Sequence, residues 1–196
     1  MLQEKLSQYK VVLASGSPRR QQFLRELNIE FEIRLKEVEE VYPDHLKGEA
    51  ITDYLAELKA AALQETLSEN EILITSDTIV WHNDKALGKP KDYDDAFAML
   101  QSLSGNTHKV ITSVSIKSFE KSVTFNETTE VTFNRLTDEE IRYYLDNYKP
   151  FDKAGAYGIQ EWIGLIAIAG IKGSYANVVG MPVDKAYQHL LTFTER

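Results

Sequence analysis

The sequence contains no cysteine, which excludes disulfides, thiolate zinc sites and cysteine nucleophiles. Basic residues are fewer than acidic ones, with 22 Lys and Arg against 30 Asp and Glu, so the net charge is −8. This balance argues against broad nucleic-acid binding, although a small anion can still bind in a locally basic site. No His-x-x-x-His metal spacing occurs among the four histidines, which are His45, His82, His108 and His189.

Long hydrophobic runs are also missing. The longest apolar segment, from Ile163 to Ile171, includes two glycines and is too short to span a bilayer. The first residues, Met-Leu-Gln-Glu-Lys, lack the apolar core of a signal peptide. We therefore expect a cytoplasmic protein without a membrane partner. No repeat or Pro/Ser-rich linker divides the chain, which predicts a single domain over residues 1–196.

The segment from Val11 to Arg25 contains an unusual helix start. Val11 to Ala14 is typical of a buried strand, and Ser15-Gly16 of a tight connection to a helix that begins at Ser17-Pro18. Arg19 and Arg20 then fall in the first turn, where the macrodipole disfavours a cation by roughly 0.3–1 kcal/mol. A phosphate chain bound at the helix start would offset this cost. The alternative is that both arginines are solvated surface residues.

The rest of the chain mixes predicted strands and helices without strict βαβ alternation. An Asp92 N-cap and a capping box at residues 137–140 mark two helix starts. Apolar periodicity predicts helices over residues 51–67, 92–103 and 137–148 and after Pro182, and strands over residues 31–35, 72–75, 108–119 and 123–133. The expected fold class is therefore α/β, with a mixed sheet flanked by helices.

Several polar residues are candidates for chemistry. Asp77 directly follows the predicted strand over residues 72–75, and ligands of α/β proteins gather at strand ends; the alternative is a turn or capping residue. Glu39-Glu40 is either a solvated edge or part of a ligand set, and Lys59 by itself suggests a surface lysine. Lys89 precedes Pro90, which stiffens the loop and could hold the ammonium against phosphate oxygens.

Four motifs point to one family. The sequence Ala-Ser-Gly-Ser-Pro-Arg-Arg ends at Arg20, Ser-Asp-Thr-Ile-Val begins at Ser76, Lys-Ala-Gly-Ala-Tyr-Gly-Ile-Gln ends at Gln160, and a Gly-Ser-Tyr segment begins at Gly173. Together they resemble the signature of the Maf family of nucleotide pyrophosphatases. The resemblance implies a two-lobed fold with a central cleft, similar to that of the inosine triphosphate pyrophosphatases. It also implies cleavage of a nucleoside triphosphate to the monophosphate and pyrophosphate.

The resemblance assigns roles by position. Asp77 matches the general base, and Glu40 with Asp77 matches a metal site, most simply for Mg²⁺ with Mn²⁺ as the alternative. The positions that match substrate-binding residues are Ser15, Arg19, Arg20, Lys59, Thr78, Lys89 and Gln160. The combination of Arg19, Thr78 and Gln160 is similar to the branch acting on dTTP and UTP.

Other functions stay open at this point. The same chemistry could serve 7-methyl-GTP, or inosine and xanthosine triphosphates. A different class of function is a nucleotide-binding regulator of cell division in which hydrolysis is weak. The expected partner is in each case a small nucleotide rather than a nucleic acid, and a homodimer is a further possibility.

Overall fold

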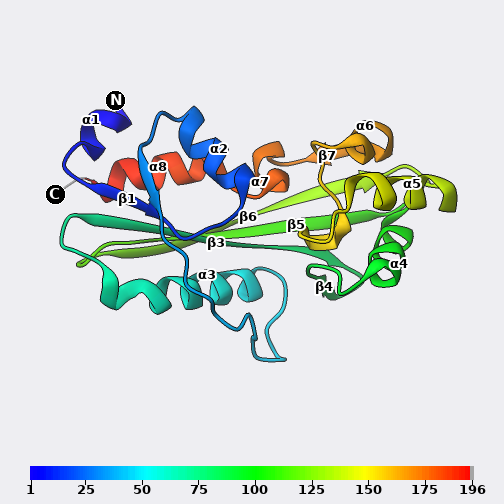
Figure 1. Ribbon diagram of the computed structural model, residues 1–196, viewed down its shortest axis with the longest axis horizontal. Coiled ribbons are helices and arrows are strands. Elements are labelled where there is room, and N and C mark those ends of the chain that lie inside the picture. The colour runs from blue at the N-terminus through cyan, green and yellow to red at the C-terminus, as the bar shows by residue number, and fades with distance from the viewer. Residues whose placement is uncertain (195–196) are drawn as a thin grey trace. The chain divides into compact units, whose positions relative to one another are not determined.

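The computed structural model describes residues 1–194, and Figure 1 shows the arrangement of their helices and strands. The elements in chain order are α1 (Leu2–Leu6), β1 (Lys10–Leu13), α2 (Pro18–Glu26), β2 (Phe31–Ile33), α3 (Glu49–Leu63), η1 (Gln64–Thr66), β3 (Glu71–His82), β4 (Lys85–Leu87), α4 (Tyr93–Leu103), β5 (Thr107–Lys117), β6 (Ser122–Phe133), α5 (Asp138–Tyr148), η2 (Ala154–Ala156), α6 (Trp162–Ala167), β7 (Ile168–Lys172), α7 (Tyr175–Val179) and α8 (Val183–Phe193).

The strands of this described part form one mixed sheet. Its order is β2-β1-β3-β5-β6-β7, and β4 pairs with β3 off this path. β1 is parallel to both β2 and β3, whereas β4 is antiparallel to β3 and β7 is antiparallel to β6. The predicted fold class, a mixed sheet flanked by helices, is confirmed.

The chain divides into two compact units. The first comprises residues 1–77, 112–127 and 180 onward, and the second comprises residues 78–111 and 128–179. Three of the four boundaries between the units fall inside β3, β5 and β6, so each of these strands contributes residues to both units, and the fourth follows α7. That residues 1–196 act as a single domain stays a prediction.

The core of the first unit follows the alternation of β1. Val11 and Leu13 pack in a large apolar cluster with residues of α1, α2 and α8, whereas Val12 packs with Ala60 and Leu63 of α3. Figure 1 shows α2 and α8 on one side of β1 and β3 and α3 on the other. Successive strand side chains point to opposite faces, so a strand buried on both faces is apolar throughout.

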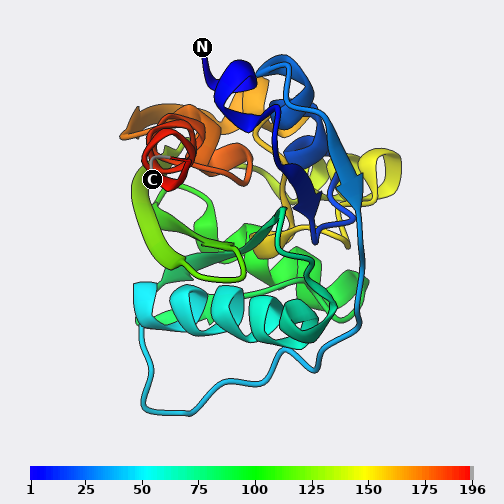
Figure 2. The same cartoon turned by 90° about the vertical axis from the view of Figure 1, so that its left-hand side faces the viewer.

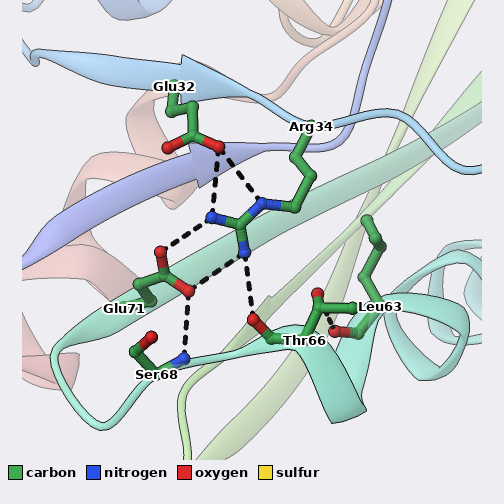
Figure 3. Close-up of polar contacts among 6 residues, drawn as sticks. All are labelled: Glu32, Arg34, Leu63, Thr66, Ser68 and Glu71. Atoms are coloured by element: carbon green, nitrogen blue, oxygen red, sulfur yellow. Dashed lines mark hydrogen bonds and ion pairs between the residues drawn. The ribbon is translucent and has the colours of Figure 1, made fainter.

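A network of polar contacts surrounds Arg34 and Glu71 in this unit (Figure 3). Arg34, just after β2, donates from Nη2 to Glu71 Oε1 at 2.7 Å and from Nη1 to Glu71 Oε2 at 3.0 Å. The backbone N–H of Ser68 donates to the same Oε2 at 3.0 Å, and Glu32 accepts from Arg34 Nη2 at 3.1 Å. These charge-assisted bonds connect the residue after β2 to the first residue of β3, with β1 between the two strands in the sheet.

Local signals predicted most elements of the fold. Asp92 caps α4 by accepting from Asp95 N at 2.9 Å, and the Thr137–Glu140 capping box opens α5. The helix expected over residues 51–67 ends as an α-helix at Leu63 and continues as η1. The short elements α1, β4, α6, β7 and α7 were not predicted, because three to six residues carry too little periodicity.

Candidate active site

The connection from β1 to α2 is built as the sequence predicts. Pro18 is the first helical residue and Ser17 occupies the N-cap position, with no acidic residue in the first turn. The Ser17 side chain makes no capping hydrogen bond, and its backbone N–H instead donates to Ser15 Oγ at 3.2 Å. Arg19 and Arg20 lie in the first turn, so the positive end of this helix carries two further positive charges.

Arg20 is held by oxygen acceptors from three separate segments. Its Nε donates to the Gly180 carbonyl at 2.8 Å, and its Nη1 donates to the Ser76 carbonyl at 3.0 Å and to Ser15 Oγ at 3.3 Å. Burial lowers the pKa of Arg20 to about 10, against the opposing effect of Asp77. Arg20 therefore stays cationic at neutral pH, in a fixed orientation beside Asp77.

Asp77 does not lie at a strand end, and that expectation is wrong. β3 continues without a break from Glu71 to His82, so Asp77 is in the middle of the strand. The neighbouring β1 pairs with β3 only as far as Ile74, so Asp77 lies beyond the carboxyl end of β1. Asp77 is therefore still next to a strand end, the end of β1, which is the kind of place where ligands of α/β proteins gather.

Lys59 joins the two candidate acidic residues. From α3, its Nζ lies 2.6 Å from Asp77 Oδ1 and 2.9 Å from Glu40 Oε1. Glu40 belongs to the long segment between β2 and α3, which in Figure 2 runs along the outer side of α3. The Asp77 side chain is 9% exposed and the Glu40 side chain 46%, so the pair consists of one buried and one accessible carboxylate.

Burial raises the pKa of Asp77 above its ordinary value. The Lys59 ammonium and the Arg20 guanidinium act in the opposite direction, and the Glu40 carboxylate adds to the increase. Burial has the largest effect because a carboxylate loses most of its hydration there. A buried carboxylate with a raised pKa and two cations beside it is a typical candidate for a catalytic base.

The donor set around Lys59 fits a divalent cation. Glu40 and Asp77 both bring a carboxylate oxygen to one ammonium, which shows that they converge on a single positive charge. Mg²⁺ prefers such hard oxygen ligands and commonly takes one or two carboxylates together with phosphate oxygens and water. No group of three or more His, Asp or Glu side chains suited to a metal occurs within residues 1–194.

The remaining candidates belong to the second unit. Thr78 follows Asp77 on β3 and is half-buried, whereas Lys89 and Gln160 are exposed. The loop that carries Gln160 is joined to the Lys89 segment, because Gly155 N donates to the Gly88 carbonyl at 3.0 Å. The structure thus brings Ser15, Arg20, Glu40, Lys59 and Asp77 together in the first unit and links the segments of Lys89 and Gln160 in the second.

Two contributions to the site were not predicted from the sequence. The carbonyls of Ser76 and Gly180 orient Arg20. Gly180 has a φ of 133°, a conformation that glycine adopts without strain. A glycine before Met-Pro is the only local signal of this role, and it does not identify Arg20 as the partner.

Comparison with known proteins places the chain in a family. The profile of the family described as Maf-like protein matches residues 10–193. A protein named dTTP/UTP pyrophosphatase from Flavobacterium psychrophilum is 61% identical over 99% of this chain and 100% of its own length. One of the same name from Flavobacterium johnsoniae is 59% identical over 98% of this chain and 99% of its own. The chain belongs to the Maf-like family.

Among solved structures, a nucleoside-triphosphatase described as a dITP/XTP pyrophosphatase, from Mycobacterium abscessus, is similar with a TM-score of 0.47. Its sequence is 13% identical, and the match covers 94% of this chain and 95% of that one. Separately, none of the helices within residues 1–194 has the length and hydropathy needed to cross a membrane.

Proposed function

We propose that this chain hydrolyses dTTP and UTP to the nucleoside monophosphate and pyrophosphate in the cytoplasm. The observation that carries the proposal is the convergence of Asp77 and Glu40 on Lys59, at 2.6 and 2.9 Å, beside the fixed guanidinium of Arg20. It is supported by the 61% identity to a protein named dTTP/UTP pyrophosphatase.

Asp77 acts as the general base in this proposal. It accepts a proton from water as the water oxygen bonds to phosphorus, the P–O bond of the α–β anhydride breaks, and pyrophosphate leaves. The raised pKa of Asp77 brings the carboxylate closer to the pH at which proton transfer is efficient. A positioned general base typically accelerates a reaction by about 10²–10⁴-fold.

Positive groups offset the charge of the triphosphate. Arg20 and Lys59 supply two cations in the first unit, and we assign Lys89 the same task. Mg²⁺ or Mn²⁺, held by Glu40 and Asp77, would neutralise phosphate oxygens. Stabilising the charge that develops during attack on phosphorus is usually the largest part of such catalysis.

Base recognition is assigned to Gln160, together with Thr78 and Arg19. The Gln160 amide can donate and accept hydrogen bonds at once, which suits the carbonyl and imide N–H of uracil or thymine. Cytosine presents a different pattern along the same edge. A site that pairs with the imide therefore rejects cytosine, because its own polar atoms would be left without partners.

A substrate panel tests the proposal. Pyrophosphate release is measured with Mg²⁺ and dTTP, UTP, CTP, 7-methyl-GTP, ITP or XTP, and dTTP and UTP are expected to have the highest kcat/KM. A higher kcat/KM for 7-methyl-GTP, ITP or XTP than for dTTP and UTP would show that the preferred base is assigned wrongly. Tight binding without pyrophosphate release would favour the regulator instead. Size-exclusion chromatography of the same sample tests the predicted homodimer.

A further inference from the structure

Gln160 is carried by a tight turn in the second unit. Residues 158–161 form this turn, in which the backbone N–H of Glu161 donates to the Gly158 carbonyl at 3.0 Å. Gln160 is the third residue of the turn and its side chain is exposed, whereas Ile159 before it is 8% exposed. The position of the Gln160 amide therefore depends on how firmly the backbone of the turn is held.

One buried hydroxyl group holds both ends of this turn. Tyr144 of α5 is 0% exposed, and its hydroxyl oxygen accepts from the Gly158 backbone N–H at 3.0 Å. The same hydroxyl donates to Glu161 Oε2 in a short hydrogen bond. Burial and the Glu161 contact raise the pKa of Tyr144, so its O–H stays available as a donor. A bond from a neutral hydroxyl to a carboxylate is among the stronger types.

The other Glu161 oxygen ties the turn to the beginning of its loop. Lys153 Nζ lies 3.1 Å from Glu161 Oε1, and the Lys153 side chain is 11% exposed. A Cβ at Gly158 would lie 3.0 Å from Glu161 Cδ and 3.1 Å from Lys153 Cε, so glycine lets the loop approach these side chains. Side chains that bind residues before and after Gln160 in the sequence therefore hold the loop in place.

We propose that Tyr144, Glu161 and Lys153 form a clamp that positions Gln160 for recognition of the pyrimidine base. The clamp rests on the proposed function, because Gln160 is the base-reading residue only if that function holds. Its three members are positioning residues, since they act through the turn. Loss of the clamp is expected to reduce discrimination between bases more than turnover.

The test compares two tyrosines of the same helix. Tyr148 lies one turn after Tyr144, stacks on it at a ring-centroid distance of 5.3 Å, and is 39% exposed. Each is changed to Phe, and kcat/KM is measured for dTTP and CTP. Tyr144→Phe is expected to lower the dTTP to CTP ratio about tenfold, less than the roughly 100-fold cost of a full 1 Å misplacement. Tyr148→Phe is expected to leave the ratio unchanged.

A double variant separates positioning from general stability. If Tyr144 acts through Gln160, adding Tyr144→Phe to Gln160→Ala lowers the ratio no further than Gln160→Ala alone, because the two changes remove the same function. A merely structural role would instead lower kcat/KM equally for dTTP and CTP in both backgrounds. That result would overturn the clamp.

Variants of Glu161 and Lys153 test the clamp independently if Tyr144→Phe folds poorly. Glu161→Gln keeps an oxygen acceptor and is expected to retain more of the dTTP to CTP ratio than Glu161→Ala, while Lys153→Met lowers it in the same direction. A wild-type preference that is lost in Gln160→Ala and kept in all these variants overturns the clamp alone. A wild-type ratio near one overturns the proposed base recognition, and the clamp with it.

Discussion

Two buried carboxylates of β3 differ in how completely they are satisfied. Glu71 and Asp77 both lie in the first unit, and each pairs with one cation, Glu71 with Arg34 and Asp77 with Lys59. In each case the cation also contacts a second, accessible carboxylate, which is Glu32 beside Arg34 and Glu40 beside Lys59. Each cluster therefore contains a buried carboxylate, a cation paired with it and an accessible carboxylate, while Arg20 also acts on Asp77 and Lys10 on Glu71.

The pKa values of the two buried carboxylates shift in opposite directions. Both oxygens of Glu71 accept from Arg34, and one also accepts from the Ser68 backbone, so its pKa lies below the ordinary value. At Asp77 burial outweighs the opposing effects of the Lys59 ammonium and the Arg20 guanidinium, so its pKa is raised. A fully bonded carboxylate stabilises the fold, whereas an incompletely compensated one is able to take up a proton.

Removing each charge in turn gives the largest expected contrast. Asp77→Asn is expected to lower kcat by about 10²–10⁴-fold, because an amide cannot accept a proton from water. Glu71→Gln is the matched control and is expected to keep kcat within about twofold, since Glu71 serves structure only. Pyrophosphate release at saturating dTTP measures both. Full turnover by Asp77→Asn would remove Asp77 from the mechanism.

Lys59 provides the second contrast. Lys59→Met is expected to lower kcat/KM by about 100-fold, the size of losing one charge-stabilising donor. The cation lowers the pKa of Asp77, so its removal raises that pKa further, and the acid limb of the pH profile moves to higher pH. Profiles of kcat/KM against pH for wild type and variant measure the movement. If the acid limb of Lys59→Met lies at the same pH as that of the wild type, ionisation of Asp77 does not determine the acid limb.

For the free energy of unfolding, we expect the larger loss at Glu71 rather than at Asp77. Glu71→Gln should lower the free energy of unfolding by about 2 kcal/mol at pH 7, because the Arg34 fork loses its charged acceptor. The folded-state pKa of Glu71 lies below its ordinary value of 4.5, so the contribution is present above that pH and disappears as pH falls through the folded-state pKa.

Asp77→Asn is the control for this measurement. Its raised pKa means that the ionised carboxylate opposes folding at neutral pH, so the neutral amide is expected to leave stability unchanged or higher. Urea unfolding at pH 7 and at pH 4 checks both variants. Equal destabilisation by the two substitutions would remove the distinction between the carboxylates.

The two accessible carboxylates give the smallest expected effects. Glu40→Gln should raise the Mg²⁺ concentration for half-maximal activity by about tenfold, as the loss of one hard oxygen ligand predicts. Glu32→Gln should leave the Mg²⁺ requirement unchanged and lower stability by at most about 1 kcal/mol, since exposed ion pairs contribute little. Activity after EDTA treatment, with Mg²⁺ or Mn²⁺ added back, measures the requirement. An identical Mg²⁺ response in Glu40→Gln would exclude Glu40 as a ligand.

Local chemistry explains which parts were predictable from the sequence. The caps at Asp92 and at residues 137–140 act within four residues, so their side chains mark helix starts directly. The polar residues after the apolar run over residues 72–75 predict a strand end before Asp77, whereas the backbone continues as β3. Polarity inside a strand reports the environment of one side chain and does not show that pairing has ended.

The contacts that define both clusters depend on the fold rather than on local pattern. Lys59 reaches Asp77 across 18 residues, and Arg34 reaches Glu71 across 37. No helical or strand periodicity relates residues at such separations, so the residues can be proposed individually but not their pairing. The family resemblance selected Lys59 and Asp77, and it carried no information about Arg34 and Glu71.

The position of α8 has a consequence for biosynthesis. Met181, Ala186, Leu190 and Phe193 belong to the same apolar cluster as β1 and α2, although all of the second unit lies between them in the sequence. A ribosome therefore delivers the first part of this core long before the part that covers it. Until α8 emerges, the part of this apolar face that α8 covers in the folded protein is exposed, so we expect the nascent chain to be most prone to aggregation at this stage.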